Sequence, residues 1–370
     1  MKHRIAVLSL TFIAITGAIL FLEMQKAECV GADCGGGSSD PIILSVSDRV
    51  ASKKQQYEEA KEISSPDGFI NTDGITVQGL IGEKVILLDF WTYSCINCQR
   101  TTPYLNAWYE KYKESGLEIL GIHTPEFEFE KRIENVKKAV ERFGIRYPVI
   151  LDNDFSTWRA YRNQYWPRKY LIDIDGFIVY DHIGEGGYEE TERKIQEALE
   201  ERMRLVGEED TIATTVSRPS GTEISSARSP EVYFGAARNE LLENGKPFTV
   251  GVQQLAALGT IQKNKLYLQS VWDIESEYAK NTEEGAKIIF RYDASRVFMV
   301  ARADSPVKIR VFLDGEPVGM LAGADVKDGV LTIEEDRLYE LVTDESGAGV
   351  HTLELRVEGH GLEVFTFTFG

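Results

Sequence analysis

Residues 91–98 read WTYSCINC and place Cys95 and Cys98 in a C-x-x-C pair. The run KVILLDFW at 84–91 is almost continuously apolar, which is typical of a strand covered on both faces of a sheet. The stretch 99–112 then repeats large apolar residues at three- and four-residue steps, the pattern of a helix with one buried stripe. The two thiols are therefore predicted at a strand-to-helix junction.

The expected position of Cys95 at a helix N-terminus predicts its chemistry. Unpaired backbone N–H groups and the positive end of the helix dipole stabilise a thiolate, the form that attacks disulfides. We therefore expect Cys95 to be the nucleophile. Cys98, one turn inside the helix, is expected to be more shielded and to resolve the mixed disulfide by intramolecular attack.

Three other interpretations of the pair are a structural zinc half-site, an inert core pair and a peroxidatic cysteine. Structural zinc normally has four ligands, and no second C-x-x-C or H-x-x-x-H follows. Cys29 and Cys34 are the other two cysteines, but a Gly- and Ser-rich stretch separates them from the pair. The redox interpretation is favoured, and no metal or other cofactor is expected.

Residues around the pair resemble thioredoxin. Asp89 lies six residues before Cys95, Trp91 four before it and Pro103 eight after it, and all three offsets are similar to those of thioredoxin. The dipeptide Trp166-Pro167 precedes an expected strand at 169–180, where the thioredoxin-like fold has its cis-proline.

Longer segments narrow the resemblance. Five of them resemble the thioredoxin-like domain of the DipZ proteins within the TlpA group: WTYSCINCQRTTPYL, GIHTPEFEFE, IRYPVILDN, YWPRKYLIDIDG and IGEGGY. Four more resemble the β-domain that follows it there: VYFGAARNE, VFLDGEP, RLYELV and LEVFTFTFG. DipZ proteins typically carry a multi-spanning electron-transfer domain of the CcdA type, whereas this chain has one apolar segment. The resemblance therefore implies a separate CcdA-type electron donor.

The resemblance also implies roles for residues near the thiols. Asp89 is expected on the buried strand behind them, where a carboxyl resists ionisation and its raised pKa suits proton exchange with Cys98. The alternative is a hydrogen-bonded strand aspartate without catalytic work. Pro167 is expected to be cis and to face the thiols, and Trp91 and Trp166 are expected to contact substrate. A trans proline leading into a strand is the alternative.

The N-terminal segment predicts membrane insertion. Positive residues precede an apolar run from Ile5 to Leu22, which approaches the roughly 30 Å of bilayer hydrocarbon. No A-x-A cleavage signal follows, so we expect an uncleaved single-pass anchor at 1–28, with the body outside the cytoplasm by the positive-inside rule. Secretion after cleavage is the alternative. A tether is expected at 29–62, where Cys29 and Cys34 form a small disulfide, are lipidated or remain free.

The remaining chain is expected to form two domains. Alternating elements at 63–200 predict an α/β thioredoxin-like domain, a mixed sheet flanked by helices: strands ending at residue 91 and at 117–123, 147–151 and 170–180, and helices at 99–112, 128–143 and 189–202. The helix at 128–143 is the insertion that distinguishes TlpA-like proteins from minimal thioredoxin. It either contributes to partner choice or is simply solvated.

After a linker at 201–229, residues 230–370 predict an antiparallel β-sandwich of short alternating strands with Asp-Gly turns at 314–315 and 328–329. An active site is not expected there, because this region has no cysteine and no metal-type histidine spacing. Similar sandwiches bind carbohydrate through exposed aromatics, for which the candidates are Trp272, Tyr278, Tyr292 and Tyr339. A docking or spacer role is favoured over this, because aromatics in strands are more often core.

Together these features predict a membrane-anchored, extracytoplasmic thiol-disulfide oxidoreductase that acts on disulfides of exported proteins, and the resemblance favours a reductant. The net charge of −18 argues against nucleic acid as a partner. One alternative is a peroxiredoxin-type thiol peroxidase, for which Thr92-x-x-Cys95 is a partial match but Leu88 stands where a proline is expected. Another is a non-enzymatic protein whose β-sandwich binds a ligand.

Overall fold

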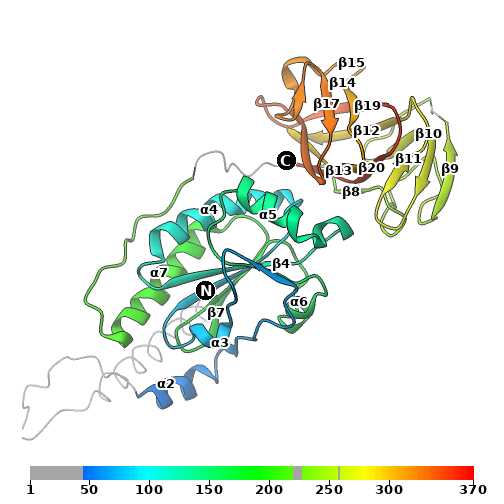
Figure 1. Ribbon diagram of the computed structural model, residues 1–370. Helices are drawn as coiled ribbons and strands as arrows, with labels where there is room; N and C mark the ends of the chain where they lie inside the picture. The colour runs from blue at the N-terminus through cyan, green and yellow to red at the C-terminus, as the bar shows by residue number, and fades with distance from the viewer. Residues whose placement is uncertain (1–44, 220–226, 257–258) are drawn as a thin grey trace, which may run out of the picture. The chain divides into compact units, whose positions relative to one another are not determined.

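The computed structural model describes residues 45–219, 227–256 and 259–370 (Figure 1). The apolar run at 5–22, Cys29 and Cys34 lie outside the described residues. Within the described ranges, no helix is both long and apolar enough to cross a membrane. Residues 50–370 form one compact unit that holds both sheets and the C-x-x-C pair. In the preceding unit, the Ser45 hydroxyl accepts a hydrogen bond from the backbone N–H of Asp48 as the first helix begins.

The first sheet is mixed and carries helices on both faces. Its described strands follow the order β1-β7-β6-β3-β4-β5-β2, with β3 parallel to β4 and antiparallel to β6. The α/β arrangement predicted from the alternating pattern is therefore confirmed. In chain order the elements of this part are α2 (Val46–Lys53), β1 (Glu58–Glu59), β2 (Gly68–Ile70), α3 (Val77–Leu80), β3 (Val85–Trp91), α4 (Ile96–Tyr112), β4 (Leu117–His123), η1 (Glu128–Lys131), α5 (Ile133–Arg142), β5 (Val149–Leu151), α6 (Ser156–Ala160), β6 (Arg168–Ile172), β7 (Phe177–Ile183) and α7 (Tyr188–Val206).

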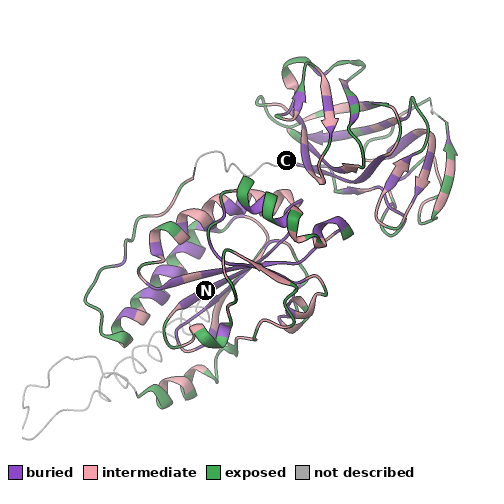
Figure 2. Cartoon of the chain, in the orientation of Figure 1, coloured by how far each residue is buried: buried purple, intermediate pink, exposed green. Residues whose placement is uncertain are grey.

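Strand β3 divides the core into two layers, because successive side chains of a strand point to opposite faces. Val85 and Leu87 belong to the cluster that includes the buried stripes of α4, α5 and α7. Ile86, Leu88 and Phe90 belong to the cluster on the other face, with Val77 of α3 and the aromatic residues around α6. Figure 2 shows buried residues along the central strands and on one side of α4 and α7. All seven β3 residues are buried, as the apolar run predicts.

Two expected elements differ in the structure. The strand expected at 170–180 is a hairpin of β6 and β7, which reverses at a turn where Gly176 has φ +89° and the Asp173 carboxylate accepts the Phe177 N–H. The helix expected at 128–143 is a 3-10 turn, η1, followed by α5. Arg132 separates the two because its backbone is extended (φ −75°, ψ 115°).

The ordered part of the first domain extends beyond the expected limits of 63 and 200. Strand β1 pairs with β7, and Lys53 forms ion pairs with Asp173 and Asp175. Helix α7 continues to Val206, and part of the expected linker then packs on the domain. There, the buried Glu192 carboxylate accepts hydrogen bonds from the backbone N–H and hydroxyl of Ser217.

The C-terminal region is one antiparallel sheet of 13 strands in the described ranges. Strand β10 changes partners along its length: Leu266–Gln269 pair with β12, and Ser270–Ile274 pair with β9. The antiparallel arrangement is as predicted, whereas the two-layer packing of a sandwich stays a prediction. The strands are β8 (Val232–Tyr233), β9 (Gly251–Leu255), β10 (Leu266–Ile274), β11 (Ala279–Asn281), β12 (Lys287–Ala294), β13 (Arg296–Ala303), β14 (Val307–Leu313), β15 (Glu316–Pro317), β16 (Val326–Lys327), β17 (Val330–Ile333), β18 (Arg337–Thr343), β19 (Gly349–Glu358) and β20 (Leu362–Phe369), with a 3-10 turn, η2 (Gly319–Leu321), between β15 and β16.

Most of the aromatic residues considered for carbohydrate binding are buried. Trp272, Tyr292 and Tyr339 are each no more than 1% exposed and belong to the core of the C-terminal sheet. Only Tyr278 is partly exposed, and its ring packs 5.2 Å from that of Phe365. The burial of these three residues agrees with the favoured expectation that aromatic residues in strands are core, and it leaves them no free ring face to stack on a sugar.

The insertion after β4 packs on the C-terminal sheet. Phe365 of β20 is 2% exposed and its ring centroid lies 5.0 Å from that of Phe127 and 4.8 Å from that of Phe129. Asn135 of α5 donates a hydrogen bond to the Asp336 carboxylate at 3.2 Å. The insertion is therefore not simply a solvated helix, because it forms the docking surface for the second half of the same chain.

Replacing Phe365 with Ala should destabilise the protein, because the change leaves a cavity between the two halves. We expect the free energy of unfolding to fall by roughly 3–5 kcal/mol, the usual range for deletion of a buried Phe ring. Urea denaturation followed by fluorescence measures the change. The matched control is Phe248→Ala: this ring is 62% exposed, so a change within about 0.5 kcal/mol is expected. Equal losses in both variants would contradict the packing argument.

Candidate active site

Cys95 is the N-cap of α4, at the junction that the sequence predicts. Its Sγ accepts a hydrogen bond from the backbone N–H of Cys98 at 3.3 Å. An N-cap side chain meets the otherwise unpaired N–H groups of the first helical turn, which is an environment that favours negative charge on sulfur. Cys95 is partly exposed and both cysteines are reduced. An attacking thiol needs this combination of access and electrostatic support.

Cys98 is 2% exposed and lies behind Cys95 in the first turn of α4. Burial raises the pKa of the Cys98 thiol well above its usual range, and the hydrogen bond with Cys95 adds to this. The two thiols therefore differ in access as the C-x-x-C spacing predicts. A thiol with a raised pKa needs a nearby base before it can act as a nucleophile.

Asp89 of β3 is a buried carboxyl that acts electrostatically on Cys98. It is 2% exposed, and one of its carboxyl oxygens has no hydrogen-bond partner among the described residues. Burial raises the pKa of Asp89 to about 7, while the positive charge of Lys169 acts in the opposite direction. The negative charge of Asp89 in turn contributes to the raised pKa of Cys98. These two groups are therefore electrostatically linked.

Lys169 of β6 is a buried cation that the sequence analysis missed. It lies opposite Asp89 in the β3–β6 register, is fully buried, and donates a hydrogen bond to the Gly184 carbonyl at 3.2 Å. Burial lowers the pKa of Lys169, and the charge of Asp89 opposes this. The sequence signal for this residue was a lysine inside the strand at 168–172. A buried charge is rarely left without a partner, so such a lysine indicates a buried acidic group nearby.

The three residues expected to contact substrate have different positions. The Trp166-Pro167 bond is cis, as predicted, and Pro167 is buried. Trp166 is partly exposed, and its indole N–H donates to the Thr124 carbonyl at 3.0 Å. Trp91 is only 2% exposed and packs edge-on against the ring of His123. The expectation for Trp91 is therefore corrected: it supports the site from within the core.

The loop before Cys95 is held by Glu130, another residue that the sequence analysis missed. Glu130 is fully buried, and its carboxylate accepts hydrogen bonds from the Ser94 hydroxyl at 2.7 Å and from the Phe127 backbone N–H at 3.0 Å. His123 is also fully buried and stacks on Tyr93. Burial lowers the pKa of His123 to about 3, so its ring is neutral at physiological pH.

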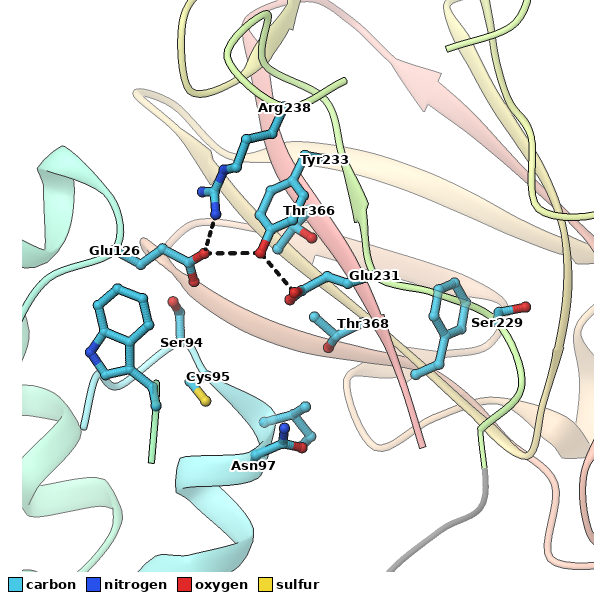
Figure 3. Close-up of a pocket in the computed structure, with 13 residues that line it drawn as sticks. Ser94, Cys95, Asn97, Glu126, Ser229, Glu231, Tyr233, Arg238, Thr366 and Thr368 are labelled. Carbon is cyan, nitrogen blue, oxygen red and sulfur yellow. Dashed lines mark hydrogen bonds and ion pairs between the residues drawn. The ribbon is translucent and has the colours of Figure 1, made fainter. Parts of the chain in front are cut away.

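A cavity of about 260 Å³ lies in front of Cys95, and both halves of the chain line it (Figure 3). Cys95, Asn97 and Trp166 belong to the first half. Among the residues of the C-terminal half are Glu231 and Thr366. The expected nucleophile therefore lines a space that the thioredoxin-like resemblance alone did not predict.

Comparisons with known proteins show which family the chain resembles. The family model "Thioredoxin like C-terminal domain" matches residues 229–370, and that of the AhpC/TSA family matches residues 58–181. The thiol-disulfide oxidoreductase ResA of Bacillus cereus is 34% identical over 147 residues, which is 39% of this chain and 80% of ResA. The chain belongs to the thioredoxin-like thiol-disulfide oxidoreductases.

Other members of this family extend the similarity over both halves. The DipZ proteins of Mycobacterium bovis and Mycobacterium tuberculosis are each 35% identical over 315 residues, which is 84% of this chain and 43% of DipZ. The chain therefore spans less than half the length of these relatives. Among solved structures, a thiol-disulfide isomerase from Corynebacterium glutamicum matches with a TM-score of 0.36 and 22% identity, covering 39% of this chain and 97% of that protein.

The raised pKa of Asp89 predicts a specific pH dependence of stability. The unfolded chain loses this proton near pH 4 and the folded chain near pH 7, so the free energy of unfolding should fall between these values and change little above pH 7. The shift corresponds to roughly 4 kcal/mol. Urea titrations at pH 5 and pH 8 should show Asp89→Asn gaining stability over the wild type at the higher pH. An equal difference at both values would contradict this ionisation.

Proposed function

We propose that this protein reduces or exchanges disulfides of exported proteins through Cys95 and Cys98. The observation that carries this proposal is the pairing of an accessible thiol at the N-cap of α4 with a buried thiol one turn behind it. Family membership supports the reaction class. The wider activity, the substrates and the partners are part of the proposal.

The reaction has two exchange steps. The Cys95 thiolate attacks one sulfur of the substrate disulfide, so that a Cys95–substrate disulfide forms, the substrate disulfide breaks, and the leaving thiolate takes up a proton. The Cys98 thiolate then attacks Cys95 Sγ, which releases the second substrate thiol and leaves a Cys95–Cys98 disulfide. Two electrons from a dithiol donor must restore the reduced pair, and we propose a separate CcdA-type membrane protein as that donor.

Asp89 is proposed to accept the Cys98 proton in the second step. Cys98 must lose its proton to attack, yet burial raises its pKa well above the usual range. A buried carboxyl whose pKa is about 7 is suited to take up and return a proton near neutral pH. The alternative, a structural aspartate, would leave the rate of resolution unaffected by loss of the carboxyl.

The proposed location is outside the cytoplasm, with the run at 5–22 as a single membrane span. The positive residues before this run and its apolar length support the proposal. Secretion after cleavage is the alternative. We further propose an anchor at 1–28, a tether to about residue 62, a thioredoxin-like domain over about 63–200 with packed flanks, a linker, and a β-sandwich domain from residue 230.

The thiol-peroxidase alternative rests on Thr92 and Cys95 and on the match to the AhpC/TSA model. Thr92 is fully buried, and its hydroxyl lies 3.5 Å from the Nε2 atom of the equally buried His123. The threonine thus has a partner inside the core. In addition, Leu88 stands where the peroxidase pattern has a proline, and both observations count against this alternative. Hydrogen peroxide consumption that is lost on Cys95→Ser alone would favour this alternative.

Trapping should identify the substrates of the proposed exchange. In Cys98→Ala the second step cannot occur, so Cys95 should accumulate mixed disulfides with protein partners. Non-reducing gels and mass spectrometry of the captured species measure this directly. The matched control is the double variant Cys95→Ala/Cys98→Ala, which should capture nothing. Failure of Cys98→Ala to form any mixed disulfide would overturn the exchange mechanism.

Replacing Asp89 with Asn should slow resolution, because an amide cannot accept the Cys98 proton as the Asp89 carboxylate does. We expect a loss of at least about tenfold in single-turnover release of the second thiol at pH 7. The wild-type rate should rise with a midpoint near pH 7, where Asp89 ionises, and the variant should lack this midpoint. Identical pH profiles would assign Asp89 a structural role.

A further inference from the structure

Cys95 lines the cavity between the two halves of the chain, so a disulfide bound in this cavity lies beside its thiol. The cavity volume of about 260 Å³ is near the lower limit of sites for small ligands. It therefore accommodates a small disulfide or an extended peptide segment, and it does not accommodate a folded surface. Groups of the C-terminal half that line this cavity can therefore contact a ligand that is bound there beside Cys95.

Those groups include a network of ionisable side chains. Arg238 forms an ion pair with Glu126 at 2.8 Å and stacks on the ring of Tyr233 at 3.6 Å. The Tyr233 oxygen lies 3.0 Å from a carboxyl oxygen of Glu126 and 2.7 Å from one of Glu231. Figure 3 shows the four side chains joined in this order above Cys95.

The Tyr233 hydroxyl has two carboxyl acceptors, Glu126 and Glu231. A phenol has one hydrogen and can donate it to only one of them at a time. Arg238 is the counter-ion of Glu126, so Glu231 is the carboxyl of the two that takes up a proton more readily.

Within the part of the chain that the structure describes, Glu231 forms no ion pair of its own. Tyr233 is its only hydrogen-bond partner among the described residues, and Arg238 is already paired with Glu126. Glu231 is exposed to the cavity, but the surrounding protein limits its solvation, and Glu126 repels a second negative charge. Together these effects raise the pKa of Glu231 to about 7. When this carboxyl ionises, the three charged residues of the cavity, Glu126, Glu231 and Arg238, carry a net charge of −1.

We propose that Glu231, with Tyr233 and Glu126, forms a subsite for a positively charged group next to the substrate disulfide. This deepens and rests on the proposed exchange reaction. The ligand is a small disulfide or an extended peptide that carries an ammonium or guanidinium group close to the attacked sulfur. Its cation pairs with the ionised Glu231 carboxylate, to which the Tyr233 hydroxyl donates; where Glu231 is protonated, this proton first passes to solvent.

The test measures single-turnover oxidation of the fully reduced protein by three small disulfides at pH 6 and pH 8. These are cystamine, which is cationic, 2-hydroxyethyl disulfide, which is neutral, and 3,3′-dithiodipropionate, which is anionic. The fraction of thiols remaining after acid quench and alkylation gives the rates. The ratio of the cystamine rate to the neutral rate is the readout, because ionisation of Cys95 affects both rates equally.

The wild type should favour cystamine over the neutral disulfide at pH 8 by about five- to tenfold, as expected for one partly solvated charge pair, and should disfavour the anionic disulfide. The preference should shrink at pH 6, where Glu231 is protonated. In Glu231→Gln, the ratio of the cystamine rate to the neutral-disulfide rate should fall, at both pH values, to the ratio set by the intrinsic reactivities of the two disulfides. The matched control Glu240→Gln changes an exposed glutamate outside the cavity and should keep the wild-type ratio.

Two disulfide-containing peptides, one with Lys and one with Glu beside the cysteine, test whether the ligand is a small disulfide or an extended peptide. A charge preference with the small disulfides assigns the subsite to small molecules as well as to peptides, and a preference with the peptides alone assigns it to extended chains. No preference in either series, or a Glu231→Gln ratio equal to that of the wild type, would overturn the subsite. If the wild type reacts with none of these disulfides, the exchange reaction itself fails. If Glu231→Gln does not fold, the wild-type ratios at the two pH values still decide.

Discussion

The burial of strand β3 is the constraint on which the rest of the structure depends. Its apolar residues fill both layers of the core, so the strand lies at the centre of the first sheet. Its C-terminal end therefore delivers the cysteine loop to a fixed point at the edge of that sheet. The same burial surrounds Asp89 with apolar groups and gives a carboxyl a pKa of about 7. The position of the cysteine loop and the proton affinity of the Asp89 carboxyl thus both follow from the burial of β3.

Local patterns were sufficient to predict the first half of the fold and the cysteine pair. The period of apolar residues around 84–112 specifies a buried strand and a helix with one buried stripe, and the structure has β3 and α4 there. The hairpin of β6 and β7 was missed because the turn at Asp173–Gly176 lies in a run that is apolar on both sides. Such a turn depends on one glycine and one side-chain hydrogen bond, which periodicity does not report.

The parts of the site that escaped prediction depend on contacts between distant segments. Lys169 meets Asp89 only through strand pairing, and Glu130 reaches Ser94 across a turn of the insertion. Glu231 and Tyr233 come close to Cys95 through the docking of Phe365 against Phe127 and Phe129. No local motif encodes these distances, although a lysine inside an apolar strand and a pair of phenylalanines in an acidic turn were visible signals.

The docking of the two halves has a consequence for how the site is assembled. Both walls of the cavity belong to one polypeptide, so the second wall is present at an effective concentration that the covalent connection sets and that dilution of the protein does not change. Separate expression of the two halves would make the same wall a bimolecular ligand of the thioredoxin-like part. Completion of the cavity would then depend on the concentrations of two proteins rather than on the folding of one.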